Sequence, residues 1–488
     1  MSLKSPVGTS SPHPEEPRSG VSKDAPDGSG ASWSILRDAI PNGMAPQDEG
    51  SGGLQTASKT AALPTRFPDA GWHGFFGADA RRLGADVVAL IDQDREREGQ
   101  SLNMIASASY APLGLRQIEG SHLVNRAPMG LPGRRSVANC EQLDAIENLA
   151  IDRAKAIFGA EYVNVQALSS TIANVAVLRA ILPAEGARLL TFDELAGGHV
   201  SHGAMRHITG VGREVVSFGV TGSGAVDLDQ ARDLARKVRP HVLLAGPSSY
   251  PREIDFAGLR AIADEVGALL FTDIAHVAGL IAAGLHANPV PFSDVSTTST
   301  QKTLCGPRNG AFVFARERFG ADIDASIFPG LQGPAASNMI AARAVQMEMV
   351  ARPAFAQLMR DVVANAKAFA TGLEEGGIEL YTGGTDSHMI MAYTGENWTQ
   401  AQLVAGLAAH GILGNAMRAP GQGGEPRTAF RFGSVALTIR GLRPSEAMGL
   451  GREVAGILRA GPAASLDPAR LRRLQDLAAA HPIPSFVD

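Results

Sequence analysis

The chain contains little cysteine and few aromatic residues. Its 488 residues include two cysteines, Cys140 and Cys305, and only 5% aromatic residues. Two cysteines so far apart provide neither a disulfide framework nor the paired spacing of a zinc site, and we expect no bound metal. The sequence also lacks an apolar run of about 18 residues, the length that spans a bilayer. It lacks the apolar core of an N-terminal signal peptide as well.

There is no strong excess of charge of either sign. The formal net charge is -5 at pH 7, which argues against nucleic acid as the main partner. We therefore expect a cytoplasmic protein that acts on small molecules, with neither nucleic acid nor membrane as a partner. With 44% hydrophobic and 19% charged residues, the chain can bury large cores in two or more domains.

The first 65 residues differ in composition from the rest. They are rich in Ser, Pro, Gly and Asp and contain few large apolar residues. Such a segment cannot offset the entropy cost of ordering, so 1–65 is predicted to be a disordered N-terminal tail. Its acidic residues, among them Glu15, Glu16 and Asp24, disfavour a mitochondrial transit peptide. A helix is predicted over 78–98, within an N-terminal arm at 66–139.

Helical stretches alternate with short apolar strands between residues 140 and 335. The strands include RLLTF, REVVSF and HVLLAG. This alternation is typical of βαβ units and predicts a large α/β domain with a mainly parallel sheet. After the glycine-rich FPGLQG, a long helix over 336–351 is expected to lead into a smaller α+β domain. The segment 336–488 is thus interpreted as an interdomain helix and a small C-terminal domain.

An acid, a histidine and a lysine follow two predicted strands. The apolar run 268–271 ends in Asp273, with His276 three residues on, and Lys302 follows the hydroxyl-rich run 295–300. A carboxylate at a strand end can pair with a pyridinium nitrogen, and Lys302 is the natural Schiff-base candidate. The alternative is a helix-capping Asp273 and a surface Lys302. It is disfavoured because lysines between a threonine run and a Gly-Pro turn are not normally solvated.

The same segment resembles the serine (glycine) hydroxymethyltransferase family, which are pyridoxal 5'-phosphate (PLP) enzymes of fold type I. The family reads close to VDMAHVAGL, NPVP and TTTTHKTLAGPRGG, and this chain has TDIAHVAGL, NPVP and TTSTQKTLCGPRNG. The resemblance extends from about residue 85 to the end of the chain. It implies a PLP-dependent transferase fold, with a large domain built on a mainly parallel seven-stranded sheet and a smaller C-terminal α+β domain. It also implies a homodimer or a dimer of dimers, with sites completed across the subunit interface.

The resemblance implies roles for further residues. The turn before TIAN aligns with the family's SGS phosphate loop, although such a turn taken alone is more often just an N-cap. LAGGHVSHG resembles AHGGHLTHG, in which the histidine at the position of His199 stacks on the pyridine ring. The residues expected to hold PLP are Ser169, Ser170, Thr171, His199, Ser248, Asp273, His276, Gln301, Lys302, Gly330 and Gly333. Those expected to take part in catalysis are Lys302, Asp273, His199 and His202.

Two residues are implied to bind the substrate. Arg431, in FRFGSVALTIRG, aligns with the arginine of the family's IRVGTPAITRRG, and a planar guanidinium suits an amino-acid carboxylate. Ser107, in IASAS, matches the serine of the family's IASEN and is expected to contact the same carboxylate. Arg308 also lies in a matched motif, where a structural role and a functional one are equally compatible with the sequence.

The chain departs from the family where folate and acid/base groups are expected. NRAPMGLPGRRSVAN stands where the family has NKYAEGYPGKRYYGG, so Met129 replaces the acid/base glutamate. The other replaced positions are Ala127, Ser136 and Val137 for tyrosines, Ala108 for the IASEN glutamate, Gln301 for a histidine, and Ala416 and Met417 in the folate-side NKN. The PLP and carboxylate sites are therefore retained, whereas the tetrahydrofolate site is doubtful.

We expect an enzyme that makes or breaks the Cα–Cβ bond of a β-hydroxy-α-amino acid without folate, as an aldolase or a transaldolase. Its partners would be an amino acid and an aldehyde, and His199, His202 or a water would accept the hydroxyl proton. The alternatives are a folate-dependent hydroxymethyltransferase, another PLP enzyme (racemase, transaminase or decarboxylase), and a silent PLP-binding paralogue. Joint retention of four residues argues against the silent paralogue: Lys302, Asp273, His199 and Arg431.

Overall fold

The computed structural model describes residues 77–395 and 397–484. The predicted disordered tail lies outside the described residues. The chain divides into two units, Met1–Ala78 and Asp79–Asp488, and the fold given below is that of the second. Within the described residues, no helix combines the length and the apolar composition needed to traverse a bilayer.

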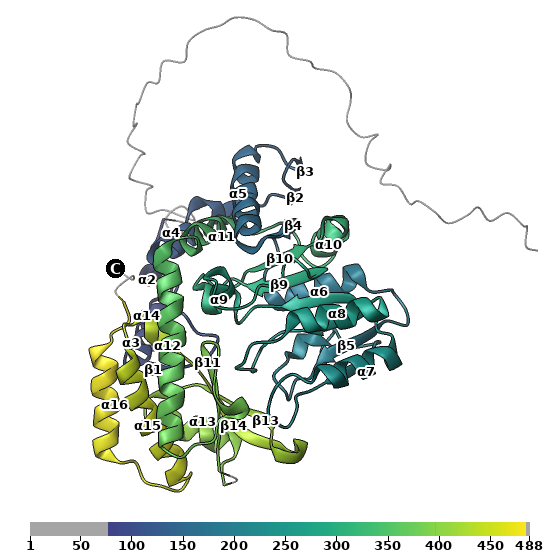
Figure 1. Ribbon diagram of the computed structural model, residues 1–488. Coiled ribbons are helices and arrows are strands. Elements are labelled where there is room, and N and C mark those ends of the chain that lie inside the picture. The colour runs from purple at the N-terminus through teal and green to yellow at the C-terminus, as the bar shows by residue number, and fades with distance from the viewer. Residues whose placement is uncertain (1–76, 396, 485–488) are drawn as a thin grey trace, which may run out of the picture. The chain divides into compact units, whose positions relative to one another are not determined.

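A seven-stranded sheet forms the centre of the large domain (Figure 1), in the order β4-β10-β9-β8-β7-β5-β6. Its strands are β4 (Tyr162–Asn164), β5 (Arg188–Phe192), β6 (Glu214–Phe218), β7 (Val242–Ala245), β8 (Leu269–Asp273), β9 (Val295–Ser299) and β10 (Ala311–Ala315). Neighbouring strands run parallel except at β10, which is antiparallel to both β4 and β9. The predicted α/β class and mainly parallel sheet are confirmed.

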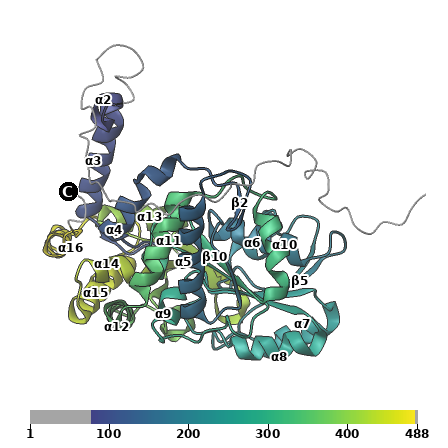
Figure 2. The same cartoon turned by 90° about the horizontal axis from the view of Figure 1, so that it is seen from above.

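Helices cover both faces of this sheet, as Figure 2 shows from above. They are α5 (Glu141–Phe158), α6 (Ser170–Ile181), α7 (Leu228–Val238), α8 (Phe256–Val266), α9 (Ala278–Ala282), α10 (Gly320–Ile327) and α11 (Ser337–Val350). Successive residues of one strand pack on opposite sides, because side chains alternate along a strand. Leu189 packs with α6 and α10, whereas Leu190 packs with α7 and α8. Burial on both faces explains why these strands read as continuous apolar runs.

The C-terminal part has a smaller, antiparallel sheet. Its strands, in the order β11-β14-β13, are β11 (Met389–Tyr393), β13 (Asn415–Pro420) and β14 (Pro426–Gly433). The helices are α12 (Pro353–Glu375), α13 (Gln400–Ala409), α14 (Val435–Ile439), α15 (Pro444–Ala460) and α16 (Pro468–Ala480). Figure 1 shows α12 as a long green helix that runs from beside α11 toward α15. This smaller α+β domain is as predicted.

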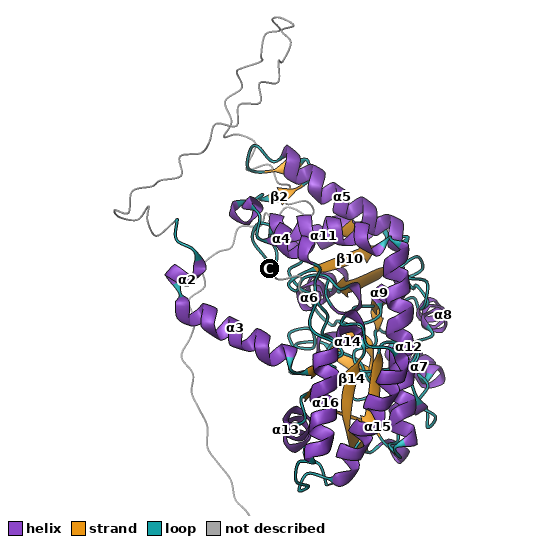
Figure 3. Cartoon of the chain, turned by 90° about the vertical axis from the view of Figure 1, so that its left-hand side faces the viewer, coloured by secondary structure: helices purple, strands orange, loops and turns teal. Residues whose placement is uncertain are grey.

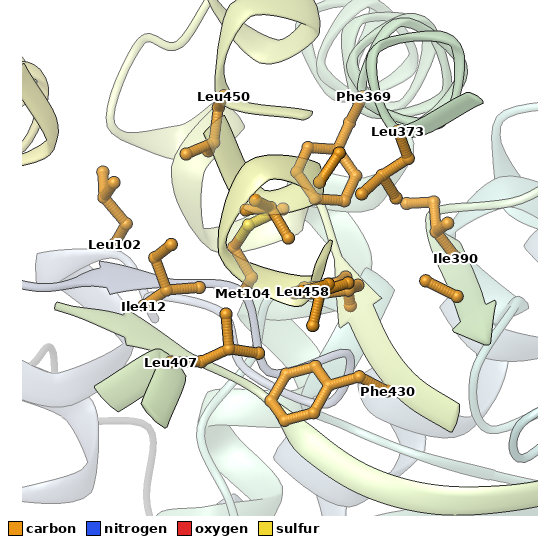
Figure 4. Close-up of a cluster of buried hydrophobic side chains, with 14 of the residues drawn as sticks. Leu102, Met104, Phe369, Leu373, Ile390, Leu407, Ile412, Phe430, Leu450 and Leu458 are labelled. Atoms are coloured by element: carbon orange, nitrogen blue, oxygen red, sulfur yellow. The ribbon is translucent and has the colours of Figure 1, made fainter. Parts of the chain in front are cut away.

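Part of the N-terminal arm packs in the small domain. Strand β1 (Leu102–Asn103) pairs in parallel with β12 (Ile412–Leu413). Leu102 and Met104 lie in one buried cluster with Phe369 and Phe430 (Figure 4). These contacts anchor this part of the arm to the small domain.

The predicted helix over 78–98 is interrupted. The structure has α2 (Ala80–Leu83) and α3 (Ala85–Gly99), separated by Gly84, and none of their residues is buried (Figure 3). The backbone of Gly84 is not helical, which ends the first helix. The remaining short elements are α4 (Leu113–Glu119), η2 (His122–Asn125), β2 (Gly130–Leu131), β3 (Arg134–Arg135), η3 (Val200–His202), η4 (Lys302–Leu304), η5 (Glu317–Phe319), η6 (Tyr381–Gly383) and η7 (Gln422–Gly424).

Candidate active site

The predicted cofactor residues meet at the carboxyl ends of the parallel strands. Asp273 is the last residue of β8, and Lys302 begins the turn after β9. Open α/β sheets bind ligands at this edge. Seven of the predicted residues line one pocket there: Ser170, His199, His202, Ser248, Asp273, His276 and Lys302. These seven residues, far apart in the sequence, are thus brought together in the folded chain.

Asp273 is a buried carboxylate with three hydrogen bonds. Its Oδ2 accepts from Asn174 Nδ2 at 2.8 Å and from His202 Nε2 at 3.1 Å, and its Oδ1 accepts from the Ala275 amide at 3.0 Å. Burial alone raises the pKa of Asp273. The hydrogen bond from His202, with the positive charge of Lys302, outweighs burial and holds that pKa well below its usual range. Asp273 is therefore ionised at neutral pH.

The hydrogen bonds around His199 and His202 determine which ring nitrogen of each carries the proton. His202 Nδ1 accepts from the His199 amide at 3.2 Å, so the proton of neutral His202 lies on Nε2 and is donated to Asp273. Asn174 Nδ2 donates to Ser201 Oγ at 2.9 Å, and that hydroxyl lies 2.7 Å from His199 Nδ1. The Ser201 amide also donates to His199 Nδ1. Neutral His199 therefore carries its proton on Nε2.

His199 is neutral under ordinary conditions. Burial, with a smaller contribution from His202, lowers the pKa of His199 to about 4. The ring is thus an uncharged aromatic surface, suited to stack on a pyridine ring. Asn174 and Ser201, which set its orientation, were not predicted. The only sequence signal for them is a polar residue among the apolar positions of α6 and a hydroxyl between two histidines.

Lys302 lies in a strained backbone conformation. Its φ is +65°, in the left-handed region, and it begins the single turn η4. Burial lowers the pKa of the Lys302 ammonium to about 8, despite the opposing charge of Asp273. A lysine with this pKa is partly unprotonated near neutral pH, as a nucleophile toward an aldehyde must be.

The N-terminus of α6 opens toward the same pocket. Ser169 is the N-cap, and its Oγ accepts from the Ile172 amide at 3.2 Å. Ser170 and Thr171 follow as the first two helical residues, whose amides have no partners within the helix. Free amides and the positive end of the helix dipole favour a phosphate at this position.

Arg431 is a half-buried residue whose guanidinium Nε is buried, and it has no acidic partner among the residues that the structure describes. Its two terminal nitrogens donate to Ser248 O at 2.7 Å and to Asn415 Oδ1 at 3.1 Å, and Nε has no partner within the same residues. Burial lowers the pKa of Arg431 to about 10, so it keeps its charge at neutral pH. An uncompensated, partly buried charge favours a bound carboxylate.

A second histidine pair joins the pocket to the segment of Ser107. The His276 and His388 rings are stacked, with centroids 5.5 Å apart, and His276 Nδ1 lies 3.4 Å from His388 Nε2. His388 Nε2 also lies 3.0 Å from the carbonyl oxygen of Ala106, the residue before Ser107. Burial lowers the pKa of His388 to about 3 and that of His276 well below its ordinary value, so both rings are neutral. His388 was not predicted.

Several predicted residues do not line this pocket. They are Ser169, Thr171, Gln301, Gly330, Gly333, Ser107 and Arg431. The first two adjoin it through the α6 N-terminus and Arg431 through Ser248. Gly330 and Gly333 follow α10, and their expected place near a partner's phosphate stays a prediction. Within the described residues, no group of His, Cys, Asp and Glu is arranged to hold a metal ion.

The segment that departs from the family is well ordered by hydrogen bonds. The guanidinium of Arg135 pairs with Asp144 at 2.8 Å and Glu147 at 2.6 Å. It also donates to the carbonyl oxygens of Pro128 and Gly130, on either side of Met129. The Met129 side chain is 41% exposed. The thioether is therefore held at the surface of this chain, outside its own pocket.

The residues present fit PLP. An ionised Asp273 suits the ring nitrogen, the neutral His199 ring suits the ring face, and the α6 N-terminus suits the phosphate. Lys302 suits the aldehyde. Each part of the cofactor has a group of matching chemistry at one edge of the sheet.

The comparison with known proteins agrees with this geometry. A family model described as serine hydroxymethyltransferase matches residues 81–454. The serine hydroxymethyltransferase of Synechococcus sp. (strain JA-3-3Ab) is 41% identical over 414 residues, which cover 81% of this chain and 95% of the relative. Serine hydroxymethyltransferase 1 of Mycobacterium tuberculosis (strain CDC 1551 / Oshkosh) is 38% identical over 429 residues, or 86% of this chain and 97% of the relative. Serine hydroxymethyltransferase 1 of Bordetella parapertussis is 39% identical over 412 residues, 83% of this chain and 95% of that protein.

Proposed function

We propose that this chain, which belongs to the serine hydroxymethyltransferase family, acts on a β-hydroxy-α-amino acid without tetrahydrofolate. The reaction makes or breaks the Cα–Cβ bond, as an aldolase or transaldolase does. One observation carries the proposal. Groups suited to PLP line one pocket and Arg431 adjoins it through Ser248, whereas the residue at the family's acid/base position is Met129.

The residues divide the work of such a reaction. Bound PLP supplies an electron-accepting ring that weakens a bond to the amino acid's Cα. Ionised Asp273 keeps a proton on the ring nitrogen, which preserves that capacity. Arg431 binds the substrate carboxylate, and the α6 N-terminus anchors the phosphate. Lys302 Nζ would hold the cofactor through its aldehyde, and the lowered pKa of Lys302 makes this amine available for that role.

The proton of the substrate's β-hydroxyl needs an acceptor. The sequence led us to expect His199, His202 or a water in this role, but the hydrogen bonds of the two histidines favour another group. Both ring nitrogens of His202 are engaged, and neutral His199 already carries a proton on Nε2. These hydrogen bonds leave neither ring a nitrogen that is free to take up the hydroxyl proton. We assign the proton to Lys302 Nζ, whose pKa of about 8 lets it act as a base. His202 becomes a positioning residue for Asp273.

Three positions matched to the family's folate side carry side chains that cannot move protons. A thioether neither donates nor accepts a proton at neutral pH, and Ala127 and Val137 likewise offer no polar atom. A second candidate function is ordinary hydroxymethyl transfer between serine and tetrahydrofolate. The name shared by the three relatives favours it. No observation favours racemisation, transamination, decarboxylation or a silent protein.

The oligomeric state and the cellular location of the protein are also proposals. We propose a homodimer or dimer of dimers, supported by exposed apolar side chains around the divergent segment, including Val124 at 61% and Met129 at 41%. A cytoplasmic location is supported by the two cysteines, which are both free and buried.

The test of the reaction class is aldehyde release. Purified protein loaded with PLP is incubated with threonine or phenylserine, without folate, and the aldehyde is measured. We expect continuous release that is abolished in Lys302→Ala. Absence of release from every β-hydroxy amino acid tested would refute the proposed reaction.

A further inference from the structure

A buried amide on α11 holds the turn that carries Lys302. The Gln346 side chain is 0% exposed. Its Nε2 donates to the carbonyl oxygens of Thr300, at 2.6 Å, and Leu304, at 3.0 Å. These carbonyls lie two residues before and two residues after Lys302. One side chain therefore fixes both ends of the segment whose middle residue is the proposed cofactor lysine.

The fit between α11 and this loop is close. A Cβ added at Gly306 would collide with the Gln346 amide, and one added at Gly310 would lie 2.6 Å from Arg343 Nε. Arg343, one turn earlier on α11, is also buried and donates to the Asn309 carbonyl at 3.0 Å. Two polar side chains of one helix face thus bind the loop, and two glycines leave room for them.

The loop needs such support because its backbone is strained. Lys302 and Cys305 both have positive φ, +65° and +55°, which side-chain-bearing residues rarely adopt. Residues in such conformations persist only where their surroundings impose them, and they are common at functional sites. The side chain of a cofactor-binding lysine must also leave and rejoin the cofactor in every turnover. Its backbone has to stay in place for the return.

We propose that Gln346 is a positioning residue that fixes the Lys302 backbone for its reaction with the cofactor's aldehyde. The inference rests on the proposed role of Lys302. Gln346 acts through two carbonyl oxygens and does not line the pocket. Its removal should therefore slow formation of the lysine–cofactor link more than it weakens binding of the amino-acid substrate.

The chain offers a matched control for loss of a buried amide. Asn365, on α12, is 1% exposed, and its Nδ2 donates to Thr438 Oγ1 at 2.9 Å and to the Leu442 carbonyl at 2.8 Å. Its Oδ1 has no partner among the described residues, as is also true of Gln346 Oε1. Asn365 lies in the small domain, with partners outside the pocket. Gln346→Met and Asn365→Leu are near-isosteric changes that each remove two donated hydrogen bonds.

The experiment compares cofactor-free wild type, Gln346→Met and Asn365→Leu. The rate of link formation with added PLP is followed by absorbance, and melting temperature, kcat and KM are measured on the loaded proteins. We expect both variants to melt earlier. In Gln346→Met, link formation and kcat should fall about tenfold to a hundredfold with KM little changed, because small misplacements at a reacting centre cost this much. Asn365→Leu should leave both rates unchanged.

Two further measurements keep the outcomes separate. Gln346→Asn keeps the amide on a shorter side chain and replaces Gln346→Met in the experiment if that variant does not fold. In Gln346→Asn we expect link formation and kcat to fall below the wild-type values, by less than the decrease expected for Gln346→Met. Borohydride reduction of the wild type, followed by peptide mapping, should label Lys302. A label on another lysine would overturn the proposed function itself. A label on Lys302 together with equal rates for Gln346→Met and Asn365→Leu would overturn only the role of Gln346.

Discussion

Replacement of Arg431 tests how the substrate is recognised. Arg431→Met removes a half-buried charge that has no acidic partner among the described residues, while keeping much of the side-chain volume. The guanidinium is held by the Ser248 carbonyl and Asn415 Oδ1, so it is oriented before any substrate binds. We therefore expect weaker binding of the amino acid and unchanged binding of PLP.

The expected increase in KM follows from the loss of the charge-assisted pair between Arg431 and the substrate carboxylate. Removing one partner of a buried, hydrogen-bonded charge pair costs about 2–5 kcal/mol. Because Arg431 is only half-buried, the lower part of that range, about 2–3 kcal/mol, applies. At about 1.4 kcal/mol for each factor of ten, KM should rise roughly 30-fold to 140-fold.

The assay measures KM for a β-hydroxy amino acid and, separately, PLP occupancy by absorbance. Arg431→Lys keeps the charge without the planar fork and should give an intermediate KM. Arg427→Met is the control on the same strand, because that arginine is at the surface and pairs with Glu379 at 2.8 Å. A KM for Arg431→Met equal to that of the control would refute the assignment of the carboxylate site.

The remaining predictions concern proton transfer and assembly. Because unprotonated Lys302 is the reactive form and its pKa is lowered to about 8, link formation by the cofactor-free protein should rise about tenfold per pH unit below pH 8 and level off above it. A rise that continues to pH 10 would contradict the lowered pKa. Asp273→Asn removes the charge opposite the ring nitrogen, so kcat should fall at least about a hundredfold while the protein stays folded by circular dichroism. Light scattering should show a dimer or larger assembly, and a monomer with full activity would argue against shared sites.

Much of the large domain could be predicted because its strands are buried on both faces. RLLTF is β5, Arg188–Phe192, and the predicted helix over 336–351 is α11, Ser337–Val350. Continuous apolar runs and helical periodicity carry this information locally. The break at Gly84 and the two-residue strands β1 and β12 were not predicted. Strands of two residues are too short to show periodicity.

The candidate site was predictable where a residue lies within a matched motif, and not where a residue supports another one. Asp273 and Lys302 are examples of the first kind. Asn174 is separated from Asp273 by 99 residues, and Gln346 from Thr300 by 46. In the sequence each is one of several polar residues of its helix, and nothing there distinguishes it from the others. Their roles follow from hydrogen bonds that only the folded chain forms.

The most direct test of folate independence is serine turnover with and without tetrahydrofolate, measured for the wild type and for Met129→Glu. The account predicts that folate does not raise the wild-type rate, because no carboxylate stands at the acid/base position. Met129→Glu serves as the comparison in which that carboxylate is restored. Strong stimulation of the wild type by tetrahydrofolate, without aldehyde release in its absence, would contradict the account and establish an ordinary hydroxymethyltransferase.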